Sequence, residues 1–314
     1  MKEISIDADI YQVLVAYNVY NRSLIPVDKL LNGDEVSSIL YRAEYDSKVY
    51  SLPYLFFVHQ QLAPGDEVVF AYNGEPAFVV RVERTEIIDK SYICELIFGV
   101  SDTKHPGVST LMSSPPYLLS GWVTDFTLEL DLPHTGSSVD LSGKSIFQSR
   151  NPPHRGHETI IAKYAPNLVY TTPYITTKSS DYSFDIKIQT YKAIQNLYGV
   201  TILTTTLPRL FAGPVEALQN CLLFQNMGAV KFIMGRGKNC IDGYHQPDEA
   251  YNLCRKFYED GRITIEPIWQ EDITYNGVEI KGSTIKTQYI DKGESPPPWL
   301  MSEYISEILL HEHK

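Results

Sequence analysis

The stretch Ser145-Ile-Phe-Gln-Ser-Arg-Asn-Pro-Pro-His-Arg-Gly-His-Glu-Thr-Ile-Ile-Ala-Lys-Tyr164 carries the pattern on which the fold of the chain depends. The run Ser145-Ile-Phe147 predicts a short strand, and the polar residues and two prolines that follow it predict a turn. Residues 158–164 then predict a helix. A strand, a turn and a helix in succession form the unit from which parallel sheets are built.

The rest of the second half repeats this alternation of short apolar strands and longer helices. Strands are predicted at 168–170, 200–204 and 231–234, and helices at 186–198, 214–227 and 249–258. A last packing helix is predicted over 299–310, after the prolines at 296–298. Such alternation predicts a parallel sheet with helices on both faces, in which ligands bind at the carboxyl ends of the strands.

The first half of the chain is predicted to be a small β domain, barrel-like or sandwich-like. Two β-rich runs, 67–72 and 75–83, are joined by Asn73-Gly74, a dipeptide that accepts positive φ at both positions of a type I′ hairpin turn. Further strands are predicted at 51–58 and 92–98.

The boundary between the two domains is predicted in residues 131–144, which are rich in turn formers and poor in apolar residues. We therefore expect a β domain over 1–135 and a catalytic α/β domain over 136–314. The chain has 314 residues, of which 43% are hydrophobic, so it can form two packed domains and is not expected to be disordered.

The net charge of the chain is −11, because it has 27 basic and 38 acidic residues. Nucleic acids and anionic membranes are not expected partners, since both bind positive surfaces. No eighteen apolar residues run together, and the first residues lack the apolar core of a secretory signal, so a cytoplasmic location is expected. The four cysteines form no CxxC pair and predict neither a disulfide framework nor a zinc knuckle.

The residues that point to chemistry lie in the turn before the helix predicted at 158–164. His154 and His157 are three residues apart at a helix start, so their imidazoles are predicted to share one face with the backbone N–H groups of the first turn. Asn151 adds an amide, and Arg150 adds a guanidinium that can bind an oxyanion through two hydrogen bonds. An isolated HxxH pair is more often structural or metal-binding. Here the pair is embedded with Arg, Asn, Pro and Gly in a strand–turn–helix context, which predicts a polyphosphate site. A zinc site is not predicted, because no third ligand stands nearby.

The segment Gln148-Ser-Arg-Asn-Pro-Pro-His-Arg-Gly-His157 resembles the QxRNPxHxxH signature of the ATP sulfurylase (sulfate adenylyltransferase) family, which belongs to the HxGH nucleotidyltransferase superfamily. Four further segments resemble motifs of this family in the same order along the chain: 98–108, 212–217, 228–236 and 280–286. The resemblance implies a PUA-like β-barrel domain followed by a Rossmann-like parallel-sheet adenylyltransferase domain with a C-terminal helical segment.

The resemblance also implies a reaction, in which sulfate attacks the α-phosphorus of ATP and forms adenosine 5′-phosphosulfate and pyrophosphate. ATP is then a substrate, Mg²⁺ accompanies the nucleotide, and no metal ligands are expected on the chain. The residues expected to act in catalysis are Arg150, Asn151, His154, His157 and Arg236. Those expected to contact the acceptor are Gln148, Arg150, Lys238 and Asn239. Those expected to contact ATP are Asn151, His154, His157, Gly235, Arg236 and the backbone near Ile268.

The chain departs from the family pattern near the acceptor. The GRDHAG loop reads Gly235-Arg-Gly-Lys-Asn-Cys240, and Lys286 replaces the arginine of ISGTxLR. Val215, Asn220 and Phe224 stand where AGPREALxHAxxR has arginine, histidine and arginine. Two alternatives therefore stay open beside sulfate transfer. One is adenylyl transfer to a different oxyanion or small organic acid, and the other is a nucleotide-binding homologue without turnover.

A sulfate-using enzyme of this kind depends on other enzymes, because formation of a phosphosulfate anhydride is strongly uphill. A pyrophosphatase and a product-consuming enzyme are the expected pathway partners. The sequence contains no Gly-x4-Gly-Lys-Ser/Thr motif, so a fused kinase that uses the product is not expected. Whether the chain forms a homo-oligomer stays open.

Overall fold

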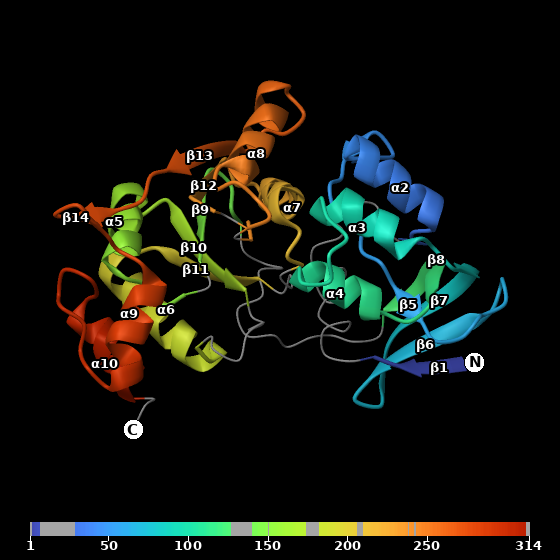
Figure 1. The fold of residues 1–314 in the computed structure, drawn as a ribbon, viewed down its shortest axis with the longest axis horizontal. Helices are drawn as coiled ribbons and strands as arrows, with labels where there is room; N and C mark the ends of the chain where they lie inside the picture. The colour runs from blue at the N-terminus through green and yellow to red at the C-terminus, as the bar shows by residue number, and fades with distance from the viewer. Residues whose placement is uncertain are drawn as a thin grey trace. The chain divides into compact units, whose positions relative to one another are not determined.

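The computed structural model describes residues 2–6, 29–126, 140–149, 151–173, 182–205, 210–237, 239–241 and 243–311. The chain forms two compact units, whose elements Figure 1 follows by colour. Unit 1 comprises Met1–Leu132, Leu210–Asn226 and Gly237–Thr264, and unit 2 comprises Pro133–Arg209, Met227–Arg236 and Ile265–Lys314. The domain boundary predicted at residues 135 and 136 lies outside the described residues and stays a prediction.

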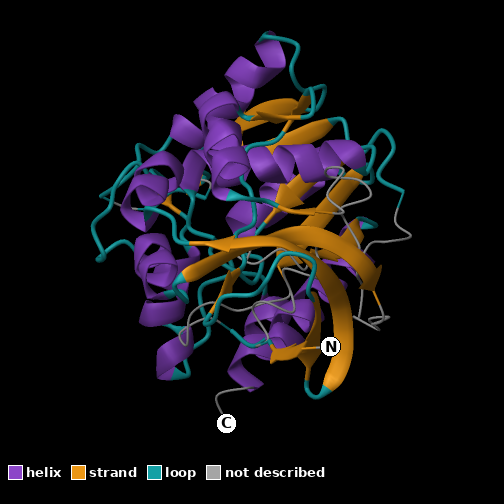
Figure 2. Cartoon of the chain, turned by 90° about the vertical axis from the view of Figure 1, so that its right-hand side faces the viewer, coloured by secondary structure: helices purple, strands orange, loops and turns teal. Residues whose placement is uncertain are grey.

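Unit 1 is built on a curved six-stranded sheet in the order β1-β6-β7-β8-β2, with β5 paired to β8 (Figure 2). Its strands are β1 (Lys2–Ser5), β2 (Lys29–Leu30), β5 (Phe57–Val58), β6 (Glu67–Tyr72), β7 (Glu75–Glu86) and β8 (Tyr117–Phe126). A separate short hairpin joins β3 (Glu44–Tyr45) to β4 (Lys48–Val49). The predicted β domain is therefore confirmed as a sheet structure.

The turn between β6 and β7 is the hairpin that the Asn73-Gly74 dipeptide predicts. Asn73 has a φ of 52° and Gly74 a φ of 83°, and Tyr72 pairs with Glu75 across the turn. Positive φ at both central positions defines the type I′ turn, which matches the twist of antiparallel strands. This local prediction is confirmed.

Residues 92–98, predicted to form a strand, lie in helix α3 (Lys90–Phe98), so that prediction is wrong. The Asp89 carboxylate accepts a hydrogen bond from the Tyr92 N–H at 3.1 Å, and Gly99 ends the helix with a φ of 72°. The run is apolar at most positions and fits either structure, whereas the N-cap and the glycine at its end specify a helix.

The other helices among the described residues of unit 1 are α2 (Gly33–Arg42), α4 (Pro106–Ser113), α7 (Gly213–Asn226) and α8 (Glu249–Glu259). The last two confirm the helices predicted at 214–227 and 249–258, and they pack on each other. In the strand predicted at 51–58, only β5 is extended sheet structure. The Ser51 hydroxyl donates to the Val215 carbonyl at 3.0 Å, and Pro53 has no N–H for strand pairing. The segment therefore packs against α7.

Unit 2 contains a five-stranded parallel sheet in the order β11-β10-β9-β12-β13. The strands are β9 (Ser145–Gln148), β10 (Leu168–Pro173), β11 (Thr201–Thr205), β12 (Lys231–Gly235) and β13 (Glu266–Gln270), and the first four confirm the sequence prediction. From β9 the chain builds outward to β10 and β11, and then returns to place β12 and β13 on the other side of β9. The strand order reverses between β9 and β12, and ligands bind such sheets beyond the carboxyl ends at this switch point.

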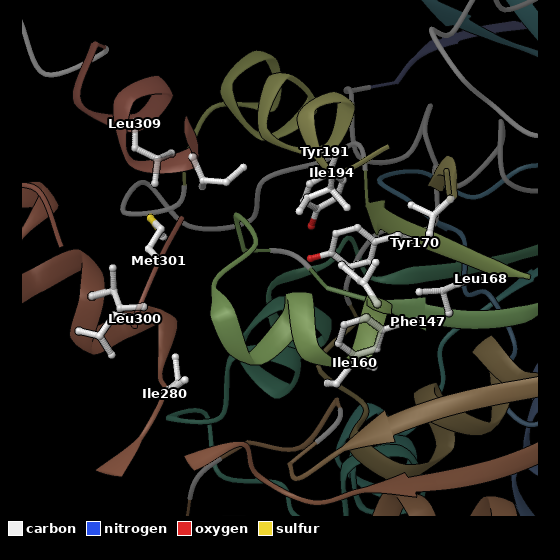
Figure 3. Packing of buried hydrophobic residues seen from close by; sticks show 14 of the residues in the cluster. Phe147, Ile160, Leu168, Tyr170, Tyr191, Ile194, Ile280, Leu300, Met301 and Leu309 are labelled. Atoms are coloured by element: carbon white, nitrogen blue, oxygen red, sulfur yellow. The ribbon is translucent and has the colours of Figure 1, made fainter. Parts of the chain in front are cut away.

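The core of unit 2 lies between the sheet and its helices (Figure 3). Its helices are α5 (Arg155–Tyr164), α6 (Phe184–Tyr198), α9 (Gly282–Gln288), η1 (Ile290–Lys292) and α10 (Glu303–His311), and a hairpin pairs β14 (Thr274–Tyr275) with β15 (Val278–Glu279). Phe147, Tyr170, Tyr191, Ile194 and Leu309 are among the buried side chains that join these elements. The core thus connects the strand β9 directly to the helices that flank it.

The C-terminal helix α10 begins at Glu303, whereas the sequence pattern predicts a helix from residue 299, after the prolines. The Pro297 carbonyl accepts hydrogen bonds from the Leu300 and Met301 N–H groups and closes a turn there. This turn buries Leu300 and Met301 before the helix starts, so the apolar spacing at 299–301 reflects burial and not helix. No helix within the described ranges combines the length and hydrophobicity that a membrane span requires.

Candidate functional site

Tyr191, a fully buried residue of α6, anchors the loop between β9 and α5. Its hydroxyl lies 3.0 Å from the carbonyl oxygen of Ser149 and 3.0 Å from that of Asn151, so its proton is shared between them. The Ser149 N–H also donates to the Thr171 carbonyl at 2.9 Å. The residues on both sides of Arg150 are therefore held in place. Arg150 itself lies outside the described residues, and its role stays a prediction.

His154 and His157 stack their rings at the start of α5. The ring centroids are 3.8 Å apart and the ring planes differ by 20°. His154 is the N-cap residue, with extended backbone and no hydrogen bond from its side chain to the helix. The imidazoles therefore share one face, as their spacing of three residues predicts, and the His154 ring is not used to cap the helix.

The His157 ring is enclosed by aromatic side chains of the two central strands. Phe147 of β9 meets it edge to face, with centroids 5.5 Å apart, and the Tyr170 hydroxyl of β10 lies 3.5 Å from His157 Nδ1. The Tyr170 and Tyr191 rings lie 4.4 Å apart, and Figure 3 shows their hydroxyl groups close together. These contacts connect the histidine pair to the sheet and to α6, so the pair rests on rigid elements.

Burial lowers the pKa values of both histidines. The pKa of His154 falls to about 4, because the residue is only 7% exposed and burial disfavours the charged form of its ring. The pKa of His157 is also well below its usual value, first through burial and then through repulsion by His154. Both rings are thus neutral near pH 7 without a ligand. Nδ1 of His154 has no hydrogen-bond partner among the described residues.

Two glycines lie close to these side chains. A Cβ at Gly156 would lie 3.0 Å from Cε1 and 3.1 Å from Nδ1 of His154, closer than most side-chain contacts. A Cβ at Gly282, the first residue of α9, would lie 3.5 Å from His154 Cδ2 and 3.6 Å from Asn151 Nδ2. Glycine at 156 therefore leaves room for the His154 ring to fold back over the helix start, and the start of α9 borders the same site.

Arg155 lies between the two histidines, and its side chain contacts other parts of unit 2. Its Nε donates to the Pro298 carbonyl at 2.8 Å, and its Nη1 lies 3.0 Å from the Glu158 carboxylate. Its backbone N–H donates to the Leu300 carbonyl at 2.9 Å. The guanidinium is thus committed to the C-terminal segment and to a neighbouring carboxylate.

The strand β12 brings Gly235 and Arg236 to the edge of the sheet at which β9 ends. The register pairs Ile233 with Phe147, so Gly235 and Gln148 end neighbouring strands at the switch point. The Arg236 side chain is 58% exposed, and its Nη1 lies 3.4 Å from the Asp272 carboxylate. An exposed ion pair of this kind contributes little to stability, so the guanidinium is available to an anionic ligand.

The remaining predicted contact residues lie on other elements of the chain. Ile268 is a half-buried residue of β13 that pairs with Ile233, and its predicted contact with ATP stays a prediction. Asn239 belongs to unit 1 and has a φ of 59°. Lys238 lies outside the described residues. The acceptor side of the predicted site thus stays a prediction.

The departures from the family pattern have a structural counterpart. Phe224 is fully buried and Asn220 is 6% exposed, so positions with basic side chains in the family contribute to the packing of α7 here. The Lys286 ammonium forms an ion pair with Asp291 at 2.5 Å.

Among the described residues, no three His, Cys, Asp or Glu side chains gather where they could hold a metal ion.

Sequence reasoning missed the two tyrosines that hold the site, Tyr170 and Tyr191. Tyr191 contacts carbonyl groups some 40 residues earlier in the chain, and no local motif connects them. The available signal is indirect, since a tyrosine on the buried face of a helix needs a hydrogen-bond partner for its hydroxyl.

Fold and site together define a Rossmann-like α/β protein with an HxxH pair at the switch point of its sheet, as in the HxGH nucleotidyltransferases that its signature resembles. The chain belongs to the ATP-sulfurylase family, a family of enzymes. The sequence model of that family matches residues 145–312, and the model of a PUA-like domain matches residues 12–127.

Relatives of this chain include proteins named sulfate adenylyltransferase from Ignicoccus hospitalis and Thermococcus onnurineus. They are 24% and 26% identical to it, over 94% of this chain and 86% of theirs. A solved structure described as a hexameric APS kinase from Thiobacillus denitrificans matches 99% of this chain with a TM-score of 0.71 and 12% identity. This chain spans 63% of that protein, and the likeness supports the fold alone.

Proposed function

We propose that this protein transfers the adenylyl group of ATP to sulfate and forms adenosine 5′-phosphosulfate and pyrophosphate. The observation that carries the proposal is the stacked pair of His154 and His157 at the N-terminus of α5, at the switch point of the sheet. Imidazole donors beside the N–H groups of a first helical turn suit a polyphosphate. Membership of the ATP-sulfurylase family and relatives named sulfate adenylyltransferase support the same reaction.

The reaction requires placement and charge stabilisation more than proton transfer. A sulfate oxygen attacks the α-phosphorus in line, and the bond between the α-phosphorus and the oxygen bridging it to the β-phosphorus breaks. Sulfate is already an anion, so no general base is needed. The site lowers the barrier by holding two anions together and by stabilising the negative charge that builds on the leaving pyrophosphate.

The roles of the residues follow from this chemistry. Gln148 and Arg150 would hold sulfate, bordered by Lys238 and Asn239. The triphosphate would lie against Asn151, His154, His157 and Arg236, with the nucleotide near Gly235 and the backbone of Ile268. Mg²⁺ would enter with ATP and neutralise part of the phosphate charge. A bound triphosphate favours protonated imidazoles, so it is expected to raise the pKa values of both histidines.

The proposed product would be consumed elsewhere, because its phosphosulfate anhydride is formed against an unfavourable equilibrium. A pyrophosphatase that removes pyrophosphate and an enzyme that uses the sulfated nucleotide would draw the reaction forward. We propose these two classes of enzyme as pathway partners. The substrates themselves are small molecules.

The test is a pyrophosphate-release assay with ATP and a panel of acceptors: sulfate, other oxyanions, and small sulfonates, phosphonates and carboxylates. Release that depends on sulfate, and that His157→Asn abolishes, would support the proposal. Release with another acceptor but not with sulfate would favour a changed acceptor, which the Gly235-to-Cys240 loop allows. ATP binding by calorimetry without ATP–pyrophosphate exchange would identify a nucleotide-binding homologue instead.

A further inference from the structure

Glu158, the residue after the histidine pair, is a buried carboxylate that the proposed reaction does not use. It is 2% exposed and lies in the first turn of α5. Four side chains direct hydrogen-bond donors at its two oxygens. A carboxylate can be buried at this depth only when such donors replace the water that it loses.

The donors come from three elements of unit 2. Ser302, which directly precedes α10, donates to Oε1, and the hydroxyl of Tyr304 in the first turn of α10 donates to Oε2 at 3.2 Å. The Tyr198 hydroxyl at the end of α6 donates to Oε2 at 3.1 Å. Arg155 Nη1 completes the set at 3.0 Å. Glu158 and these four residues form a cluster that we call the Glu158 clamp.

The clamp joins the first turn of α5 to the segment that precedes α10. Arg155 reaches the same segment through the Pro298 and Leu300 carbonyls. On its other side, Glu158 is bound to the histidine pair, because its backbone N–H donates to the His154 carbonyl at 2.9 Å and it follows His157 directly. The turn is thus held between the C-terminal segment and the site.

We propose that Glu158 is a positioning residue for the proposed adenylyl transfer, and that the clamp holds the imidazoles of His154 and His157 in the orientation that the phosphates require. The inference rests on the proposed function. The reaction depends on placing charged groups, so a displacement of the helix start of about 1 Å can cost about 100-fold in rate. The clamp therefore matters for turnover beyond its contribution to stability.

The decisive variant is Glu158→Gln, which keeps the shape of the side chain but points an amide N–H₂ group at donors. We expect kcat for ATP–pyrophosphate exchange to fall by about 10- to 100-fold, with a smaller change in KM for ATP. The NMR signals of the His154 and His157 rings in the ligand-free protein should shift as well, since the helix start moves. Tyr304→Phe, which removes one donor, should change both readouts in the same direction to a smaller extent.

Two controls separate positioning from stability. Leu309→Ala removes a buried side chain of α10 outside the clamp, so it should lower the melting temperature but leave kcat and both histidine signals unchanged. Glu307→Gln, at an exposed position of the same helix, should change none of the three. If Glu158→Gln lowers only the melting temperature, as Leu309→Ala does, the clamp is structural and the proposal is wrong.

The outcomes also separate this inference from the proposed function. A wild-type protein that turns over none of the acceptors would contradict the proposed function, and unmoved histidine signals in Glu158→Gln would then contradict the clamp independently. If Glu158→Gln does not fold, the proposal is tested with Tyr304→Phe, by measuring kcat and the NMR signals of the two histidines. Unchanged kcat and unchanged histidine signals in that variant would overturn the proposal.

Discussion

The burial of His154 predicts a specific loss of stability in acid. Its pKa is about 4 in the folded chain, against about 6.5 in an unfolded one. Above pH 6.5 the ring is neutral in both states, and its contribution to stability is fully present. As the pH falls below 6.5, His154 becomes protonated in the unfolded chain but stays neutral in the folded chain. The free energy of unfolding therefore decreases until the pH reaches about 4.

The size of the effect follows from the two pKa values. Between pH 7.5 and pH 5 the wild-type protein should lose about 2 kcal/mol of unfolding free energy through His154. The variant His154→Asn should lack this part of the loss. Any pH-independent effect of the substitution, such as better capping of α5 by asparagine, cancels when the two pH values are compared.

The assay is urea-induced unfolding of wild type and variant at both pH values. Trp269 and Trp299 lie in unit 2 and Trp122 in unit 1, so a Trp122→Phe background makes tryptophan fluorescence report on the unit that contains His154. At pH 7.5 and pH 8.5 the difference between wild type and variant should be the same. An equal acid loss in wild type and His154→Asn would refute the assignment of a lowered pKa to this ring.

Three further outcomes are expected. Tyr191→Phe leaves two loop carbonyls without their shared donor, so the free energy of unfolding in urea should fall by about 1–3 kcal/mol. Pyrophosphate release should fall as well. An unchanged free energy of unfolding would contradict the anchoring role of Tyr191. Gly74→Ala forces a φ of 83° on a residue with a Cβ, so the free energy of unfolding should fall by about 1–2 kcal/mol, while KM for ATP should not change. A variant as stable as the wild type would mean that the turn can change type. Arg236→Ala should raise KM for ATP by about 10- to 100-fold and should change the melting temperature little. Asp272→Asn releases the guanidinium from its ion pair, so this variant should not raise KM for ATP.

Much of the fold could be predicted because its signals are local. The strand at 145–147, the prolines after it and the helix that follows are written in adjacent residues, and the Asn73-Gly74 turn depends on two residues alone. Where local signals conflicted, the prediction failed. Residues 92–98 have the composition of a strand, but Asp89 and Gly99 cap them as a helix, since caps satisfy backbone groups that composition ignores.

The sequence predicts the side chains of the candidate site but not the contacts that hold these side chains in place. The spacing of His154 and His157 predicts a shared face, and the structure stacks their rings. The contacts that hold them, from Tyr191 to the loop and from Glu158 to Ser302, connect residues about 40 and 144 positions apart. Contacts at such separations depend on how helices pack, and no periodicity in the sequence encodes them.

By itself, the sequence determined the alternation that produces a parallel sheet, the turn that carries the HxxH pair, and the resemblance that led to the ATP-sulfurylase family. Only the tertiary structure decided that the histidines are neutral, that Arg155 is committed to the C-terminal segment, and that a buried carboxylate joins the first turn of α5 to α10. The reason is physical. Periodicity and turn chemistry act between neighbours along the chain, whereas burial and the pairing of charges depend on which distant residues the packed core brings together.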